Sequence, residues 1–139
     1  MENRHLNDLV RDQSPVTLEP QATVRSACRK MGDRRVGCVL VTEKGKLVGI
    51  FTGRDAVRLL ASEDAPETMT LAGAMTRNPT TLSPKASAMD ALRLMQDGGF
   101  RHVPIVRDDV LVGVVSRGDF RAMEHARLDE ETGYWERIY

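Results

Sequence analysis

Aromatic side chains are scarce in this chain, at 4% of its 139 residues. Proteins that bind single-stranded nucleic acids stack the bases on aromatic rings, so the sequence disfavours that class. An excess of either charge is also lacking, because 20 Lys and Arg balance 20 Asp and Glu. A dominant DNA- or RNA-binding surface needs a basic excess. We therefore expect no nucleic-acid partner.

Long apolar runs are lacking as well. No run approaches the roughly 20 residues that a membrane-spanning helix needs. The polar residues 1–5 do not resemble the start of a signal peptide, which carries an apolar segment. We therefore expect a cytoplasmic protein with no membrane association. The two cysteines, Cys28 and Cys38, fit reduced thiols in that compartment and are too few for a zinc site.

Groups suited to catalysis are few. The three histidines are His5, His102 and His125, and no cluster of His, Cys or carboxylates has the spacing of metal ligands. No P-loop pattern occurs. A nucleotide hydrolase needs a nucleophile with its base, or metal ligands that converge on the phosphate. We therefore expect no metal, no catalytic cofactor and no enzymatic activity.

What the sequence does contain is an internal repeat. When the chain is shifted by 64 residues, residues 15–56 align with residues 79–120 without a gap, and 14 of the 42 pairs are identical. Composition bias does not explain matched prolines, glycines and aspartates, such as Pro15/Pro79, Gly49/Gly113 and Asp55/Asp119. We infer a duplication, which organises the whole chain.

Each copy begins with a predicted strand and helix. The strand, residues 16–18 or 80–82, is short and is followed by a proline that ends it. A helix comes next, with Thr23 or Ser87 as its N-cap. Its apolar residues recur at i, i+3, i+4 and i+7, the spacing of an amphipathic helix. Gly98 and Gly99 supply a stop for this helix in the second copy.

Two further strands and a second helix complete the β-α-β-β-α pattern. The strands are predicted at 38–42 and 47–51, and again at 102–106 and 111–115, each pair joined by a short polar hairpin. The second helix begins near Asp55 or Asp119. We expect the apolar residues of its first copy to pack on the sheet; they are Ala56, Val57, Leu59 and Leu60.

The repeats divide the chain into four parts: repeat 1 at 5–61, a polar linker at 62–70, repeat 2 at 71–122 and a C-terminal extension at 123–139. Residues 6–11 and 71–75 are expected to form short helical turns that lead into the repeats. The extension holds the single tryptophan, Trp135, beside Tyr134. We expect this aromatic pair to pack on its own domain or on a second subunit.

Two tandem βαββα units, each ending in strand–[Ser/Thr]-x-x-Asp–helix, resemble CBS domains. The two copies of that motif are Thr52-Gly53-Arg54-Asp55 and Ser116-Arg117-Gly118-Asp119, and residues 78–84 and 101–106 also resemble the family. The motif is frequent by chance, but two copies at matched places are fairly specific. The resemblance covers residues 5–122. It implies an α/β (α+β) fold in which two repeats related by a pseudo-two-fold form one compact, stand-alone module.

The aspartates of the motif have chemistry suited to a nucleoside. One carboxylate can accept hydrogen bonds from both ribose hydroxyls, so Asp55 and Asp119 are candidate ribose-binding residues. The hydroxyls three residues earlier and the free N–H groups of the helix N-terminus favour a phosphate. Candidate phosphate-binding residues are therefore Thr52, Arg54, Ser116 and Arg117. The alternative is that each aspartate only caps its helix, and both roles can coexist.

The resemblance further implies that each cleft combines the aspartate of one repeat with strands of the other. Asp55 would be joined by a base pocket of Pro79, Thr80 and Thr81, and by Arg101 and His102, which could neutralise a polyphosphate. Asp119 would be joined by Pro15, Val16, Thr17, Gly37 and Cys38. Gly37 and Cys38, which stand where the other cleft has Arg101 and His102, bring no charge. We therefore expect unequal clefts, with the Asp55 cleft the better binder of phosphate-rich ligands.

The function implied by the resemblance is a regulatory module without catalysis. The expected ligand is AMP, ADP, ATP or NAD(H), and S-adenosylmethionine is the alternative ligand. Family resemblance also implies a homodimer and an unidentified effector protein. A ligand-independent protein-interaction scaffold, with clefts that are empty or filled by a partner's side chains, remains the alternative function.

Overall fold

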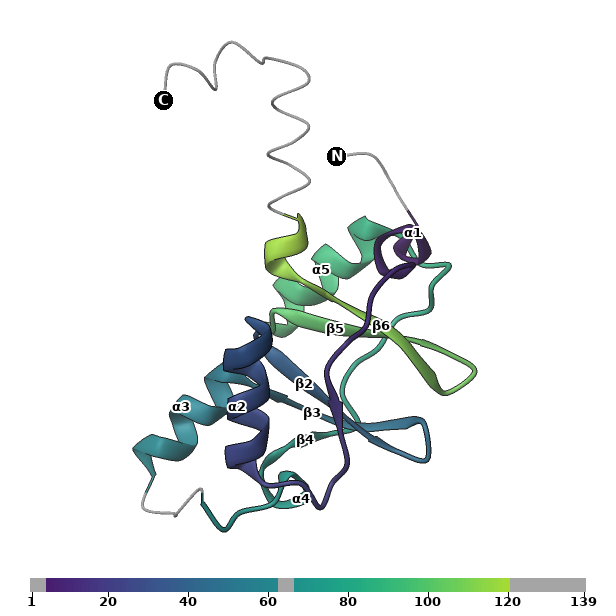
Figure 1. Cartoon of the computed structure of the whole chain (residues 1–139). Coiled ribbons are helices and arrows are strands. Elements are labelled where there is room, and N and C mark those ends of the chain that lie inside the picture. The colour runs from purple at the N-terminus through teal and green to yellow at the C-terminus, as the bar shows by residue number, and fades with distance from the viewer. Residues whose placement is uncertain (1–4, 63–66, 121–139) are drawn as a thin grey trace.

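The computed structural model describes residues 5–62 and 67–120, and they form a mixed α+β fold with two halves (Figure 1). The described strands make one sheet in the order β1-β2-β3-β6-β5, with β4 paired to β3. These strands are β1 (Thr17–Leu18), β2 (Cys38–Glu43), β3 (Lys46–Thr52), β4 (Thr76–Arg77), β5 (His102–Arg107) and β6 (Val110–Ser116). Within the described residues, the two hairpins, β2–β3 and β5–β6, pair as strands at a single position, where Lys46 pairs with Val110.

The 64-residue repeat is preserved in the pairing of the strands. Cys38 pairs with Thr52, and its counterpart His102 pairs with Ser116; every later pair of β2–β3 has its counterpart in β5–β6. Even the irregularity between Val41 and Thr42 recurs between Ile105 and Val106. A shared register of this kind puts equivalent side chains on equivalent faces, so the duplication is structural as well as sequential.

The helices of the two repeats begin with the predicted caps. Helix α2 (Val24–Arg34) starts after Thr23, whose hydroxyl accepts from the N–H of Ser26 at 3.0 Å. Helix α5 (Ala88–Gly98) starts after Ser87 with a full capping box. Gly99 ends α5 in the left-handed conformation, at φ 72°, and Arg35 ends α2 in the same conformation, at φ 54°. Glycine adopts it without steric cost, whereas arginine does so only at some expense.

The first strand differs between the copies, and a proline explains the difference. In repeat 1 the N–H of Leu40 donates to the carbonyl of Val16 at 2.9 Å beside β1. In repeat 2 the residue equivalent to Leu40 is Pro104, which has no N–H to donate. The expected strand at 80–82 is consequently reduced to a single bridge between Leu82 and Ile105. The prediction of an equal strand there is therefore wrong.

The short lead-in helices are exchanged between the repeats. Helix α1 (Leu6–Val10) precedes repeat 1, yet the N–H of Leu6 donates to the carbonyl of Ala86, and Leu6 and Val10 lie in the core of repeat 2. Helix α4 (Leu71–Ala74) precedes repeat 2, yet the N–H of Leu71 donates to the carbonyl of Ala22, and Leu71 lies in the core of repeat 1. Figure 1 shows α1 beside α5 and α4 near the foot of α2. The two repeats therefore interlock.

The core has one apolar cluster in each half and a smaller one between them. The last cluster contains Cys38, Leu40 and Ile50 with Leu111 and Val114, so it joins the repeats. Helix α3 (Gly53–Ala61) contributes only part of its apolar face to the core of repeat 1, through Ala56 and Leu59. The expectation that Val57 and Leu60 also pack on the sheet is wrong, since they are 67% and 71% exposed.

Three further expectations meet the structure in different ways. The helical turns predicted near residues 6–11 and 71–75 are present as α1 and α4. None of the helices in residues 5–62 and 67–120 combines the length and the apolar character that crossing a membrane requires. The packing predicted for Tyr134 and Trp135 lies outside the described residues.

Candidate ligand-binding clefts between the repeats

Asp55 and Thr52 form a reciprocal capping pair at the corner between β3 and α3. The Thr52 N–H donates to Asp55 Oδ2 at 2.9 Å, and the Asp55 N–H donates to Thr52 Oγ1 at 3.2 Å. The capping role considered from the sequence is therefore real. It occupies one carboxylate oxygen only; no protein donor to Oδ1 is found among the described residues. Asp55 thus keeps an acceptor for a ligand while its orientation is fixed.

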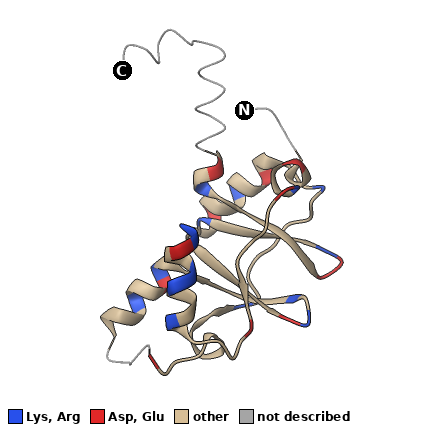
Figure 2. Ribbon diagram, viewed as in Figure 1, with Lys and Arg blue, Asp and Glu red and all other residues tan. Residues whose placement is uncertain are grey.

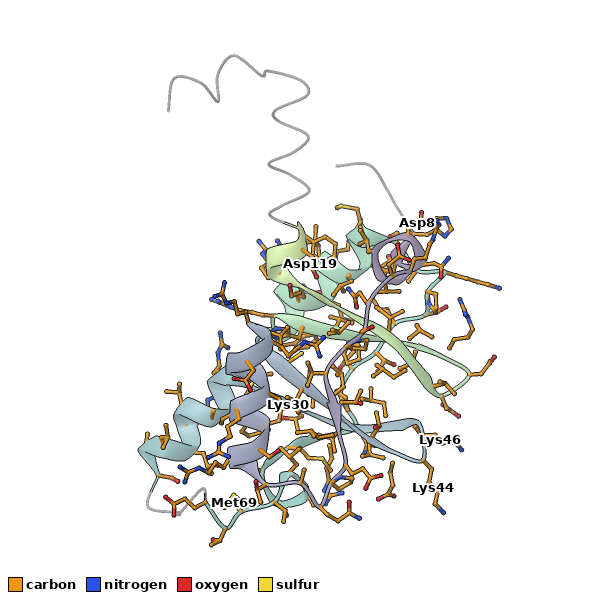
Figure 3. The ribbon with its side chains drawn as sticks, in the orientation of Figure 1. Asp8, Lys30, Lys44, Lys46, Met69 and Asp119 are labelled. Carbon is orange, nitrogen blue, oxygen red and sulfur yellow. The ribbon has the colours of Figure 1, made fainter. Side chains whose placement is uncertain are left out.

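Asp119 and Ser116 form the equivalent pair at the corner after β6. The Ser116 N–H donates to Asp119 Oδ2 at 2.7 Å, and the Asp119 N–H donates to Ser116 Oγ at 3.3 Å. Figure 3 shows Asp119 in the first turn of the helix that follows β6. Asp119 is more exposed than Asp55, which is half-buried. The second corner is therefore the more open of the two.

A cleft of about 550 Å³ lies beside Asp55 and is shared by both repeats. Repeat 1 contributes Thr52, Arg54 and Asp55, and repeat 2 contributes Arg101 and His102. Of the expected base pocket, Pro79 and Thr80 line the cleft, and Thr81 lies outside its lining. The sequence reasoning did not identify the remaining lining residues, which are Ile50, Arg58, Thr76, Asn78, Gly98, Gly99 and Phe100.

A second cleft, of about 330 Å³, lies beside Asp119. The predicted residues Ser116, Pro15, Val16, Gly37 and Cys38 line it, whereas Thr17 and Arg117 do not. The lining residues that were not predicted are Gln13, Ser14, Arg35, Val36, Leu40, His102 and Val114. Gly37 and Cys38 bring no charge to this cleft, as expected, but the guanidinium-bearing Arg35 also lines it, and His102 belongs to both linings.

The two clefts are copies of each other. Shifted by 64, most lining residues of the Asp119 cleft become lining residues of the Asp55 cleft; Ser14 becomes Asn78, and Val36 becomes Phe100. This equivalence follows from the shared strand register. Two similar corners, each completed by the other repeat, are what the sequence resemblance implied.

Comparison with known protein families agrees with this architecture. The sequence pattern of the CBS domain matches residues 6–62 and again residues 71–125. The chain belongs to the CBS-domain family. Its described part is a tandem CBS pair, in which each match contains one of the two Asp-bearing corners.

The relatives range from proteins much longer than this chain to one of similar length. It is 37% identical over 102 residues to the CBS domain-containing protein CBSCBSPB2 of Arabidopsis thaliana, a match that covers 72% of this chain and 19% of that protein. It is 35% identical over 103 residues to the uncharacterized protein YlbB of Bacillus subtilis, with 73% of this chain and 70% of YlbB covered. The chain therefore spans about a fifth of the length of the Arabidopsis relatives that it matches first.

Solved structures share the fold. The CBS domain protein NE2398 has a TM-score of 0.83 at 26% identity, with 88% of this chain and 98% of that chain covered. The CBS pair of MJ0100, solved with 5′-methylthioadenosine and S-adenosyl-L-methionine, has a TM-score of 0.82 at 23% identity over 91% of this chain and 99% of that chain. PAE2072 of Pyrobaculum aerophilum, solved with AMP, has a TM-score of 0.77 at 24% identity, with 84% of this chain and 89% of that chain covered.

The clefts of this CBS pair differ in charge. The Asp55 cleft has three guanidinium groups, from Arg54, Arg58 and Arg101, against one carboxylate. Arg54 and Arg58 are one helical turn apart on α3, so they lie on the same face. Figure 2 shows basic residues on α3 and around the C-terminal end of α2, where the halves meet. The Asp119 cleft has one arginine, Arg35, so the Asp55 cleft is the more basic.

The two conspicuous strand glycines of the CBS repeats serve packing. A Cβ at Gly49 would collide with the side chain of Met75, and its place is 3.0 Å from the carbonyl oxygen of Thr76. A Cβ at Gly113 would collide with Val10, and Gln13 is also close. From the sequence, a strand glycine can indicate the close approach either of a ligand or of another chain segment. At both glycines the structure shows the close approach of another chain segment.

His102 and Cys38 occupy equivalent places in the two repeats and are both perturbed. Burial lowers the pKa of His102 below its ordinary 6.5 and outweighs the opposing effect of the Asp119 carboxylate, and Arg101 adds a smaller lowering effect. Burial and the nearby Asp119 carboxylate raise the pKa of the Cys38 thiol to about 12. Cys38 is thus an un-ionised thiol at neutral pH and a poor nucleophile. No group of three His, Cys, Asp or Glu suited to a metal is found in residues 5–62 and 67–120.

Proposed function

We propose that this CBS pair is a regulatory module that binds an adenine nucleotide in its inter-repeat clefts. The observation that carries the proposal is the pair of capped aspartates, each with one carboxylate oxygen bonded within its own repeat and a cleft completed by the other repeat. The AMP complex of PAE2072 and the adenosyl complexes of MJ0100, which share the fold, support an adenosine-containing ligand.

The chemistry of the Asp55 cleft fits such a ligand part by part. Asp55 Oδ1 can accept from the ribose diol in charge-assisted hydrogen bonds. Pro79, Thr80 and Phe100 offer an apolar and polar surface for the base. Arg54, Arg58 and Arg101 can hold phosphates, since guanidinium groups bind them in a bidentate manner. A volume of about 550 Å³ is within the usual range of ligand pockets. We propose AMP, ADP, ATP or NAD(H) here.

The Asp119 cleft suits a smaller or less anionic ligand. Its volume is about 330 Å³ and its lining has one arginine. S-adenosylmethionine, which carries no phosphate, is the alternative ligand that this difference favours. The MJ0100 complex with that compound supports the alternative.

Regulation would follow from where the ligand sits. Each cleft takes residues from both repeats, so a ligand that fills it links them. A ligand shifts a conformational equilibrium only by its differential affinity for the two states. The output would pass to an effector protein, attached or separate. A ligand-independent scaffold remains the competing proposal, in which partner side chains would fill the clefts.

We also propose that the module is a cytoplasmic homodimer. The family resemblance supports the dimer, and so does helix α3. Its outer face carries two apolar side chains, Val57 and Leu60, at 67% and 71% exposure. They are three residues apart and so lie on one side of the helix.

A thermal-shift panel tests the proposed function. Purified protein is heated with AMP, ADP, ATP, NAD, NADH, S-adenosylmethionine or guanosine triphosphate as a base control. A ligand at 100 times its Kd stabilises by about 2.7 kcal/mol, which is readily measured for a chain this small. At least one adenosyl compound should raise the midpoint. No shift with any of them favours the scaffold, and a shift that survives both Asp55→Ala and Asp119→Ala places the site elsewhere.

A further inference from the structure

One side chain, His102, lines both clefts. It is the first residue of β5 and pairs in register with Ser116, three residues before Asp119. Its equivalent in repeat 1 is Cys38, which lines the Asp119 cleft alone among the described linings. The imidazole therefore stands in the wall between the two clefts, at a place where the pseudo-symmetry of the CBS pair is broken.

The space for the imidazole is provided by Gly37 of the other repeat. A Cβ at that position would be 3.0 Å from Nε2 and 3.2 Å from Cε1 of His102. The ring edge that carries Nε2 thus lies against Gly37, and both residues line the Asp119 cleft. The same ring contributes to the lining of the Asp55 cleft together with Arg101.

The charged groups around His102 define its state. Asp119 favours the imidazolium, whereas burial and Arg101 disfavour it, and the net effect is a pKa below 6.5. The Cys38 thiol is un-ionised at neutral pH. The remaining charged groups of the linings are Arg54, Arg58 and Asp55 in one cleft and Arg35 in the other. At pH 7 the protein's own groups therefore keep His102 neutral.

We propose that His102 contacts the phosphate of a ligand bound in either cleft and does so as the imidazolium. Binding of the phosphate therefore raises the protonated fraction of the ring, with the proton taken up from solvent. This inference rests on the proposed nucleotide binding and adds its pH dependence. An anion beside a half-buried imidazole favours the charged ring. No bond to the ligand forms or breaks, and the proton remains on the ring until the phosphate leaves.

A shared proton connects the two sites. A phosphate in either cleft favours the same protonated ring. Once the first ligand has bound and His102 is charged, the second ligand binds without a further free-energy cost of protonation. By linkage, this connection is reciprocal. It fades at acidic pH, where the ring is charged before any ligand binds.

The decisive experiment follows the imidazole resonances of His102 by NMR, with ADP as the probe and adenosine as its phosphate-free control. The sequence has three histidines, and His102→Gln assigns the signal. Saturating ADP should raise the titration midpoint of His102 by a unit or more, which corresponds to a tenfold preference for the charged ring. Adenosine should leave it unchanged. The rise should persist in Asp55→Ala and in Asp119→Ala, each of which retains one capped corner.

Calorimetry gives an independent measure. ADP binding at pH 7, repeated in buffers of different ionisation enthalpy, should show net proton uptake by the wild type. Because the phosphate itself titrates near pH 6, the uptake by His102→Gln is subtracted. His102→Gln should bind ADP about two- to tenfold more weakly than the wild type at pH 6 and equally at pH 8. If ADP binds and the His102 midpoint does not move, His102 is only part of the wall. If the midpoint rises through one cleft alone, the shared role is wrong. If no nucleotide binds, the proposed function fails first.

Discussion

The imidazole of His102 lies against Gly37, at the contact where a Cβ on residue 37 would come within 3.0 Å of Nε2. The two residues belong to different repeats and are not counterparts in the duplication, since Gly37 corresponds to Arg101 and His102 to Cys38. Their contact lies beside the Asp119 cleft, which both residues line. It depends on repeat 1 having a glycine at the position where repeat 2 has Arg101.

Gly37→Ala should therefore disturb the wall. The backbone at Gly37 does not need a positive φ, since only Gly45 and Gly99 among the described glycines have one. The added methyl must displace the imidazole, and overpacking of this kind costs about 1–3 kcal/mol. We expect the low end, because the ring borders a cavity into which it can turn. Urea denaturation should show the loss, and the NMR signal of His102 should shift.

Gly32→Ala is the matched control. Gly32 lies within α2, and an added Cβ there meets nothing within 4 Å. Alanine in place of a helical glycine stabilises by roughly 0.5–1 kcal/mol in the middle of a helix, and we expect the low end because Gly32 is in the last turn of α2. The two substitutions should thus change stability in opposite directions. If Gly37→Ala were as stabilising as Gly32→Ala, the contact with His102 would not exist in solution.

Asp55→Ala should remove nucleotide binding from its cleft beyond any effect on folding. Asp90 is the matched control, because it makes the same capping box with Ser87 at the start of α5 and does not line either cleft. Both alanine variants should lose stability through the lost cap. Only Asp55→Ala should lose adenosine affinity at the Asp55 cleft. Loss of hydrogen bonds to a charged group predicts a 10- to 100-fold effect.

Asp55→Glu separates the two roles further. Glutamate at the third helical position retains the capping box, but its carboxylate is displaced by one methylene from the ribose. We expect near-wild-type unfolding with weakened adenosine binding, as measured by calorimetry. Equal adenosine affinity for the wild type and Asp55→Glu would show that the carboxylate acts as a cap alone.

The fold was predictable because the duplication constrains it twice. Both hairpins, both capped helices and the sites of both aspartates follow from matched residues at one offset. The weakening of the strand near Leu82 could also have been predicted from the sequence. Pro104 stands where repeat 1 has Leu40, whose N–H donates the hydrogen bond that holds the first strand. The exchange of α1 and α4 had no such signal. Leu6 and Leu71 are 65 residues apart, outside the 64-residue register, and their partners are set by long-range packing.

The site divides in a similar way. The motif residues and their cross-repeat neighbours follow from the resemblance, and the structure brings most of them to two clefts. Arg58 could have been found, because it lies four residues after Arg54 on a predicted helix. The place of Arg35 in a cleft lining and the double role of His102 could not have been predicted from the sequence. They depend on how closely the repeats approach, which no local pattern encodes.

Arg58→Ala and Arg101→Ala should weaken phosphate-rich ligands selectively. Both side chains line the Asp55 cleft, from α3 and from the segment before β5. Each should reduce ATP affinity about tenfold, the effect of one charge-assisted contact of roughly 1.5 kcal/mol. Adenosine affinity should change little. The control is Arg29→Ala, an exposed residue of α2 outside both linings. A loss of adenosine and ATP binding in equal measure would assign these arginines to the base or ribose instead.

Leu60→Lys should weaken the proposed homodimer. A charge on the exposed apolar face of α3 would have to be buried against the second subunit, which is costly without a partner charge. Light scattering coupled to size exclusion should show a dimeric wild type and a monomeric variant. Val110→Lys, at an exposed valine of the β5–β6 hairpin, is the control and should remain dimeric. A monomeric wild type would contradict the dimer, and a dimeric Leu60→Lys would place its interface elsewhere.

His102 should also make the stability of the protein depend on pH. Its pKa is lowered in the folded state by burial and by Arg101, so the unfolded chain binds more protons as the pH falls below about 6.5. The free energy of unfolding of the wild type should consequently fall as the pH decreases from the pKa of His102 in the unfolded chain to its lower pKa in the folded protein.

His102→Gln lacks this contribution and should lose less stability between pH 7.5 and pH 5.5. Asp119→Asn removes the carboxylate that favours the imidazolium, so its loss should be steeper than that of the wild type. Urea unfolding at the two pH values measures all three proteins, and the other titrating groups cancel in the differences. An identical pH dependence for the wild type and His102→Gln would mean that the ring is as solvated in the folded chain as in the unfolded one, and could not stand in a wall between two clefts.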